Sequence, residues 1–101
     1  MREPAPPFKT VEVTARFEKS VAKLQKPQRD QVWAKAKLLF DNPAHPSLKA
    51  HSIKPDKYYH EAYVNTGDRI VYIPEGSHLV LVDVVPHDDI DRYRSAPKQK
   101  G

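Results

Sequence analysis

The sequence contains no cysteine among its 101 residues. Disulfide bonds, thiolate nucleophiles and cysteine-ligated zinc sites are therefore excluded. Long hydrophobic runs are also missing, since no apolar segment approaches the length needed to span a bilayer. The initial stretch MREPAPPFKT lacks the apolar core of a signal peptide. We therefore expect a cytoplasmic protein that does not associate with a membrane.

What remains is an ordinary globular composition, with 39% hydrophobic and 30% charged residues. The length suits one domain, which we place at residues 10–96 between a flexible tail at 1–9 and a second tail at 97–101. The net charge of +4 is uneven, because residues 1–57 carry a balance of +6 and residues 58–101 a balance of −2. The basic half could attract a polyanion, although a solvated basic face without a partner explains the charge equally well.

The spacing of apolar residues predicts the order of the elements. Residues 10–17 alternate as in a half-buried strand, and helical spacing begins at Phe17 and runs to Pro27. Residues 27–43 form the clearest helix, ended by Asp41-Asn42-Pro43. Its Trp33 could stack on a base, but an aromatic residue on an apolar stripe is more often core, and we predict core.

The C-terminal half predicts a sheet. Residues 43–57 are interpreted as a loop, and strands follow at 58–65, 69–73 and 78–85, separated by NTGD and PEGS turns. The last strand is apolar on both faces apart from Asp83, which indicates a central position. A short helix is expected from Asp88 to Ala96. The predicted fold is therefore α+β, with an N-terminal strand and a helical hairpin packed on a small antiparallel sheet.

Five histidines are present, but none of their spacings resembles a zinc motif. His87, Asp88 and Asp89 could hold a hard cation, yet neighbouring residues rarely converge on one ion. We expect no metal.

A set of polar residues is better suited to phosphate chemistry. Arginine offers a fork of donors that matches phosphate oxygens, and histidine exchanges protons near neutral pH. Because neighbouring strands of a meander are antiparallel, Arg69 and His87 should meet at one edge of the sheet, beside the loop that carries His51. The alternative is that Arg69 pairs with Asp83 or Glu61 as scaffolding and that His87 only caps a helix. The full set is Lys49, His51, Lys54, Arg69, His87, Tyr93 and Arg94.

Over residues 11–96 the chain resembles the RelE/ParE superfamily of toxins from type II toxin–antitoxin modules. The similarity lies in the element order and in three segments: HPSLKAHSI (45–53), YYHEAYVNTGDRIVYI (58–73) and LVLVDVVPHDDIDRY (79–93). In the RelE-like, HigB-like and YoeB-like branches, the toxin enters the ribosome and cuts mRNA, using the 2′-OH of the RNA as nucleophile without a metal. The resemblance thus implies an endoribonuclease without cofactors, whose partners are a cognate antitoxin, the ribosome and mRNA.

The resemblance also assigns roles to particular residues. His51 corresponds to a Lys or His of the family's loop, Arg69 to an arginine at the scissile phosphate, and His87 to a catalytic position after the last strand. Asp88, which stands where relatives carry a basic residue, would orient the ring of His87, and Tyr93 falls near a tyrosine of the RelE terminal segment. The expected RNA contacts are Lys49, Lys54 and Arg94.

Two other functions fit the same fold. A ParE-like inhibitor of DNA gyrase would need none of these side chains, and a catalytically silent RelE-fold module would only bind nucleic acid. The combination of His51, Arg69 and His87 favours the nuclease, since a protein-binding inhibitor requires no such constellation.

Overall fold

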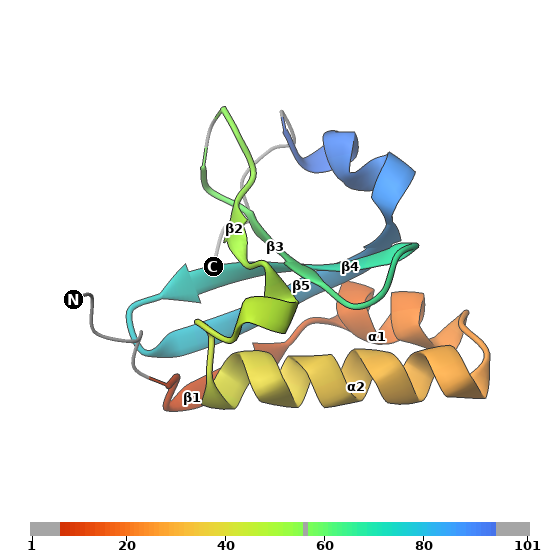
Figure 1. Ribbon diagram of the computed structural model, residues 1–101, viewed down its shortest axis with the longest axis horizontal. Coiled ribbons are helices and arrows are strands. Elements are labelled where there is room, and N and C mark those ends of the chain that lie inside the picture. Colours follow the sequence, from red (N-terminus) through yellow and green to blue (C-terminus); the bar gives the residue numbers. More distant parts are fainter. Residues whose placement is uncertain (1–6, 56, 95–101) are drawn as a thin grey trace.

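The computed structural model describes residues 7–55 and 57–94, which form a five-stranded sheet with two α-helices on one face and a 3₁₀ helix on the other (Figure 1). The expected segments at 97–101 and most of 1–9 lie outside these residues, as does the expected helix end at Ala96. The elements in chain order are β1 (Thr10–Val13), α1 (Ala15–Ala22), α2 (Lys26–Asp41), the 3₁₀ helix η1 (Pro46–Leu48), β2 (His51–Ser52), β3 (His60–Tyr63), β4 (Asp68–Glu75), β5 (His78–Pro86) and the 3₁₀ helix η2 (His87–Tyr93). The α+β fold class is confirmed.

The sheet has the strand order β1-β5-β4-β3-β2. The three-stranded meander was expected, but β2 within the expected loop was not. The sheet is also mixed rather than purely antiparallel, because β1 pairs in parallel with β5. A parallel pair requires a long crossover connection, which the two helices and the rest of the sheet provide here.

The first strand ends earlier than its alternating pattern predicts, because Thr14 starts a helix. Its hydroxyl accepts a hydrogen bond from the Phe17 backbone N–H at 3.1 Å and so caps α1. The same hydroxyl lies 2.9 Å from the carbonyl oxygens of Leu81 and Val82 in β5. The cap therefore also fixes α1 against the sheet.

Helix α2 follows the sequence prediction at both ends but not at Trp33. Gln25 and Gln28 form a capping box at its start, Pro27 lies in its first turn, and Asn42 caps its end. Trp33 is 43% exposed and touches Phe17 edge to face, so the prediction that it belongs to the core is wrong. The buried stripe of α2 consists of Val32, Ala36 and Leu39, and Trp33 lies about 100° around the helix from Val32.

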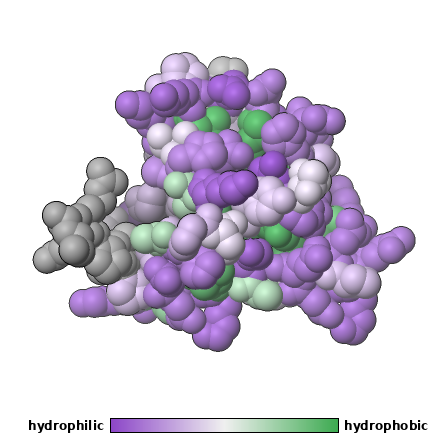
Figure 2. All heavy atoms as spheres, in the orientation of Figure 1, coloured by the Kyte–Doolittle hydropathy of each residue, from purple (hydrophilic) through white to green (hydrophobic). Residues whose placement is uncertain are grey.

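Two apolar clusters cover the two faces of the sheet. The helices and one face enclose Phe17, Leu39, Ile70, Leu79 and their neighbours. On the other face, η2 and the segment before β3 cover a second cluster of Ile53, Tyr59, Val71, Ile73, Val80, Val82, Val85, Ile90 and Tyr93. Strand β5 is buried along nearly its whole length, which confirms its expected position inside the sheet. Figure 2 shows that polar side chains cover most of one outer surface, with small apolar patches between them.

An irregularity in β5 redirects Asp83. Val71 pairs with Asp83 but Tyr72 pairs with Leu81, so Val82 is an extra residue on the β5 side. Asp83 is 3% exposed and accepts hydrogen bonds from the Ser20 hydroxyl, the Tyr93 hydroxyl and its neighbouring backbone N–H. The buried carboxylate therefore links α1, β5 and η2.

Among the described residues, no helix is both long and apolar enough to cross a membrane.

Candidate active site on the open face of the sheet

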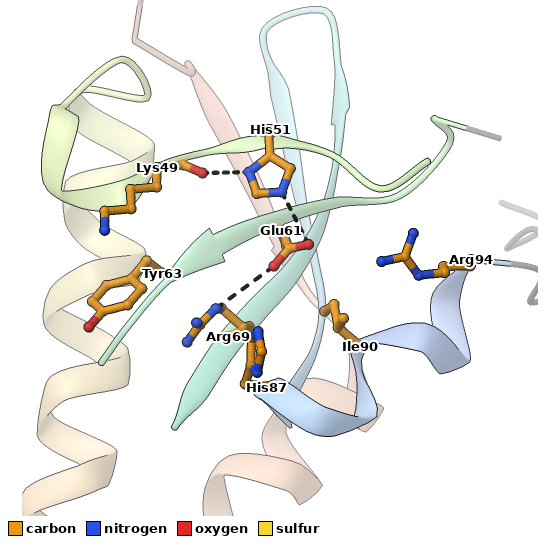
Figure 3. Close-up of a pocket in the computed structure, with 8 residues that line it drawn as sticks. All are labelled: Lys49, His51, Glu61, Tyr63, Arg69, His87, Ile90 and Arg94. Atoms are coloured by element: carbon orange, nitrogen blue, oxygen red, sulfur yellow. Dashed lines mark hydrogen bonds and ion pairs between the residues drawn. The ribbon is translucent and has the colours of Figure 1, made fainter. Parts of the chain in front are cut away.

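A hollow of about 270 Å³ opens on the face of the sheet opposite the helices (Figure 3). We call it the β-face hollow, and its lining residues are Lys49, His51, Glu61, Tyr63, Arg69, His87, Ile90 and Arg94. They come from the loop after η1, from β2, β3 and β4, and from η2 with the residue that follows it. Five segments of the chain thus supply one site.

The register of the strands explains this convergence. Tyr63 pairs with Arg69, and His51 pairs with Glu61, so these side chains project from the same face of the sheet. At the other side of β4, Asp68 pairs with Pro86, which places His87 next to the start of β4. The backbone N–H of His87 donates to the Gly67 carbonyl at 2.8 Å. The expected approach of Arg69 and His87 is confirmed.

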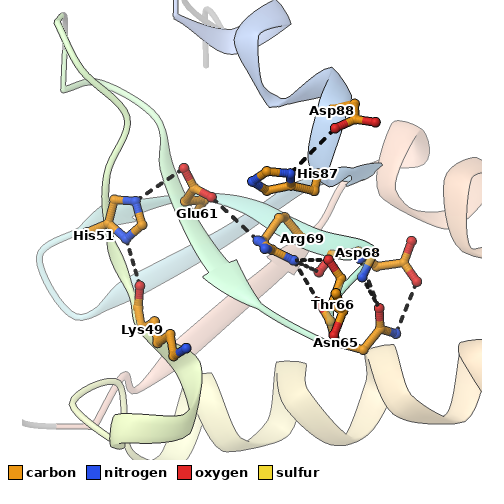
Figure 4. Close-up of polar contacts among 10 residues, drawn as sticks. Lys49, His51, Glu61, Asn65, Thr66, Asp68, Arg69, His87 and Asp88 are labelled. Atoms are coloured by element: carbon orange, nitrogen blue, oxygen red, sulfur yellow. Dashed lines mark hydrogen bonds and ion pairs between the residues drawn. The ribbon is translucent and has the colours of Figure 1, made fainter.

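Arg69 is held by a ring of acceptors (Figure 4). Its Nη1 donates to the backbone carbonyls of Asn65, Thr66 and Asp68 at 2.6, 3.3 and 2.9 Å. Its Nε lies 3.8 Å from Glu61 Oε1, and 14% of the side chain is exposed. The predicted scaffold pairing with Glu61 is therefore present, and the one with Asp83 is not. Within the described residues the Nη2 group has no recorded partner, so one edge of the guanidinium can still face a phosphate.

His51 is fixed at both ring nitrogens. Its Nδ1 lies 2.7 Å from the Lys49 carbonyl oxygen, and its Nε2 lies 3.2 Å from Glu61 Oε2. A carbonyl oxygen can only accept, so Nδ1 must be the donor in that hydrogen bond. Glu61 thus stands between His51 and Arg69 and fixes both.

Tyr63 places its ring beneath two cations. Lys49 Nζ lies 5.1 Å and the Arg69 guanidinium carbon 4.7 Å from the ring centroid, both within the range of cation–π attraction. Lys49 also has a left-handed backbone, with φ of 46°, which is rare for a residue with a side chain. The bend after η1 therefore aims Lys49 at the hollow at the cost of some backbone strain.

His87 combines a fixed backbone with an accessible ring. It is the first residue of η2, directly after the buried β5, and 60% of its side chain is exposed. Its Nδ1 lies 3.6 Å from the Asp88 carboxylate, whose side chain is 98% exposed. Asp88 contacts the ring as expected, but it lies outside the hollow.

The structure places Tyr93, Lys54 and Arg94 differently from one another. Tyr93 is buried, and its hydroxyl donates to Asp83 Oδ2 at 2.5 Å, away from the β-face hollow. Burial, with a contribution from the hydrogen bond to Asp83, raises the pKa of Tyr93 to about 12. Arg94 lines the hollow and pairs with Asp91, while Lys54 lines a smaller neighbouring hollow with His51 and Arg94.

Glu61, Tyr63 and Ile90 also line the site, although they were not among the residues predicted from the sequence. The first two could have been found, because the alternation of β3 places them on one face and the hairpin pairs Tyr63 with Arg69. Ile90 carries no chemical signal in the sequence. Across the part of the chain described, no group of three or more histidines and carboxylates is arranged to hold a metal ion.

No protein-family model and no curated protein matches this sequence. Several solved structures do match its fold. YafQ from E. coli strain BL21(DE3) superposes with a TM-score of 0.67 and 21% identity, over 79% of this chain and 94% of that one. A chain of the E. coli DinJ–YafQ toxin–antitoxin complex superposes with a TM-score of 0.64 and 21% identity, over 79% of this chain and 93% of that one. A chain of the archaeal RelE–RelB complex from Pyrococcus horikoshii OT3 superposes with a TM-score of 0.63 and 11% identity, over 78% of this chain and 93% of that one. The chain therefore has the fold of the RelE-like toxins.

Proposed function

We propose that this chain is the toxin of a type II toxin–antitoxin pair and cuts mRNA on the ribosome. Its fold is that of RelE-like toxins, and two of the matching structures are complexes of such toxins with DinJ and RelB. We infer a cognate antitoxin for this chain from that likeness. The observation that carries the nuclease proposal is the β-face hollow, which joins cationic, acid–base and aromatic side chains at one accessible site.

The cations of the hollow suit the scissile phosphate. The free edge of Arg69 and the ammonium group of Lys49 both border the hollow, and Arg94 lies at its opposite end. A phosphate under attack gains negative charge, and cations fixed before the reaction stabilise that charge without reorganising. Arg69 is well fixed, because three carbonyls and one carboxylate hold it.

His87 is the proposed general acid. Its ring is exposed and adjoins Arg69 across the strand pair, so it can reach the oxygen that leaves the phosphate. The 2′-OH of the RNA attacks phosphorus, the bond from phosphorus to the 5′ oxygen breaks, and His87 gives that oxygen a proton. The products are a 2′,3′-cyclic phosphate and a 5′-OH end.

Glu61 is the proposed base, rather than His51 or a lysine of the hollow. Because His51 Nδ1 donates to the Lys49 carbonyl, only Nε2 could act as a base, and Nε2 is turned toward Glu61. Glu61 supplies the one carboxylate among the lining residues described, and a carboxylate can take the proton of the 2′-OH. His51 then orients Glu61.

The test is brief expression of the chain followed by primer extension on a reporter mRNA. We expect discrete cuts within codons, 5′-OH ends that a polynucleotide kinase labels without prior phosphatase, and relief on co-expression of the antitoxin. Purified protein on programmed ribosomes should give the same cuts. Intact mRNA accompanied by DNA damage would replace this proposal with gyrase inhibition, and 5′-phosphate ends would refute the 2′-OH mechanism.

A further inference from the structure

A second basic hollow lies on the other side of η2, between η2 and α1. Its volume is about 330 Å³, and we call it the α1–η2 hollow. It is lined by Arg16, Lys19, Ser20, Lys23, Asp83 and Arg92. The candidate mechanism described above uses none of these residues.

The α1 helix concentrates its cations on this side. Arg16, Lys19 and Lys23 are spaced three and four residues apart, so they form one stripe along the helix and its C-cap. Arg92 reaches the same hollow from η2. Two separate elements therefore direct positive charge at one place.

Within the part of the chain described, Lys19 and Lys23 have no counterion, whereas the buried Asp83 carboxylate attracts Arg16. Among the described residues, Arg16, Lys19 and Lys23 form no ion pair, and Arg16 donates only to the Tyr93 hydroxyl at 3.4 Å. Lysines on α2 differ, since Lys26 pairs with Asp30 at 2.8 Å and Lys37 with Asp41 at 2.7 Å. Clustered like charges repel one another, so a cluster left without counterions favours an anionic ligand.

Asp83, which lines the hollow, and Asp89, which lines a neighbouring one, leave room for such a ligand. Asp83 is buried, and its oxygens already accept from Ser20, Tyr93 and a backbone N–H. Asp89 lies 3.4 Å from Arg92 and partly neutralises that residue alone. The arginine and two lysines of the α1 stripe remain for the ligand.

The position of the hollow favours a nucleic acid strand over an isolated anion. η2 is a single short element of seven residues that borders both hollows. Its His87 and Ile90 border the β-face hollow, and its Arg92 borders the α1–η2 hollow. One short strand can thus cross η2 and place phosphates in both hollows.

We propose that the α1–η2 hollow binds a backbone phosphate of single-stranded RNA, outside the site of cleavage. The choice of RNA rests on the proposed function, but the binding itself requires no cleavage. Arg16 and Arg92 supply planar donors, while Lys19 and Lys23 supply mobile charges at the rim. The hollow extends the RNA-binding surface beyond the reacting phosphate.

The test measures binding of a fluorescein-labelled 12-nucleotide 2′-O-methyl-uridine RNA by anisotropy over a range of salt concentrations. The 2′-O-methyl group removes the nucleophile, so the RNA stays intact whether or not the chain is a nuclease. The K19Q/K23Q variant is compared with the parent and with K26Q/K37Q, which loses the same charge from paired lysines. All four lysines lie at the surface, so both variants should keep the parent's melting temperature.

We expect K19Q/K23Q to weaken binding and to reduce the slope of log K against log salt by about 0.7, since the hollow is proposed to bind one phosphate and each single-strand phosphate contact contributes roughly 0.7. K26Q/K37Q should bind like the parent. Equal weakening in both variants, or in neither, would overturn the proposal. The proposal would also be overturned if inorganic phosphate displaced the RNA and sulfate at equal ionic strength did not, because that result indicates a free-phosphate site. If K19Q/K23Q lost binding to hexaglutamate but kept its binding to RNA, the hollow would be assigned to an acidic protein segment instead.

Discussion

Replacing Tyr93 with phenylalanine should destabilise the protein while leaving RNA cleavage nearly intact. The substitution removes only the hydroxyl that donates to Asp83 at 2.5 Å. The ring stays, and its edge-to-face contact with Tyr59, with centroids 4.9 Å apart, can still hold η2 against the sheet. His87 and Arg94 at the two ends of η2 should therefore keep their positions.

The size of the effect follows from the burial of both partners. Tyr93 is 4% and Asp83 3% exposed, so water cannot easily replace the lost donor. A hydrogen bond to a charged group is worth about 1.5–3 kcal/mol. The free energy of unfolding should fall by that amount, and the melting temperature by roughly 6–24 °C for a domain of this size.

The alkaline pH dependence gives a second measure of the same interaction. Burial raises the pKa of Tyr93 to about 12, helped by the hydrogen bond to Asp83, and burial alone raises that of Tyr72 to about 12. Folding therefore favours the protonated form of both groups. Their contribution is fully present below pH 10 and is lost as the pH rises from 10 to about 12. Y93F removes one of these two groups, so its stability should fall less steeply over that interval.

The assays are urea unfolding at a series of pH values and single-turnover cleavage on programmed ribosomes at 25 °C. Y63F serves as control, since it removes an exposed hydroxyl 3.3 Å from Thr66 and should leave stability within about 0.5 kcal/mol of the parent. We expect Y93F to cleave within about tenfold of the parent. A variant as stable as the parent that has lost cleavage by more than about a hundredfold would instead give Tyr93 a direct catalytic role.

The remaining predictions concern the proposed acid and base. H87Q should lower the single-turnover rate by about 10²–10⁴ without affecting stability, because 60% of the side chain is exposed; a loss below about tenfold would remove His87 from the acid role. E61Q should reduce the same rate to a similar extent and H51Q by a smaller factor. The base assignment is contradicted if H51Q is the more damaging of the two.

Several site residues could be predicted from the sequence because local position decided them. His87 follows a strand that is apolar on both faces, so its backbone had to be held at the end of β5. Arg69 begins the neighbouring antiparallel strand, and antiparallel pairing brings those two positions together. Lys49 and His51 lie in the segment that joins the sheet next to β3.

Tyr93 could not be assigned in the same way. Tyr93 lies in a helical segment, and which side of it faces the protein depends on how η2 docks on β5. The bulge at Val82 turns Asp83 to the side where Tyr93 lies, although simple alternation would place Asp83 on the same face as Leu81. The sequence offered Glu61 as a partner of Arg69, but its second contact, with His51, depends on strand β2, which the sequence did not predict.

The sequence by itself determined most of the helices and strands, with the two-residue strand β2 as an exception, since periodicity, prolines and capping residues act within a few positions along the chain. It also determined that β5 is buried and that His87 follows it directly. Only the tertiary structure decided that β1 runs parallel to β5, that Trp33 stays exposed, and that Tyr93 belongs to the interior. These outcomes depend on contacts between residues far apart in the sequence, and their free energy depends on how whole elements pack rather than on any local pattern.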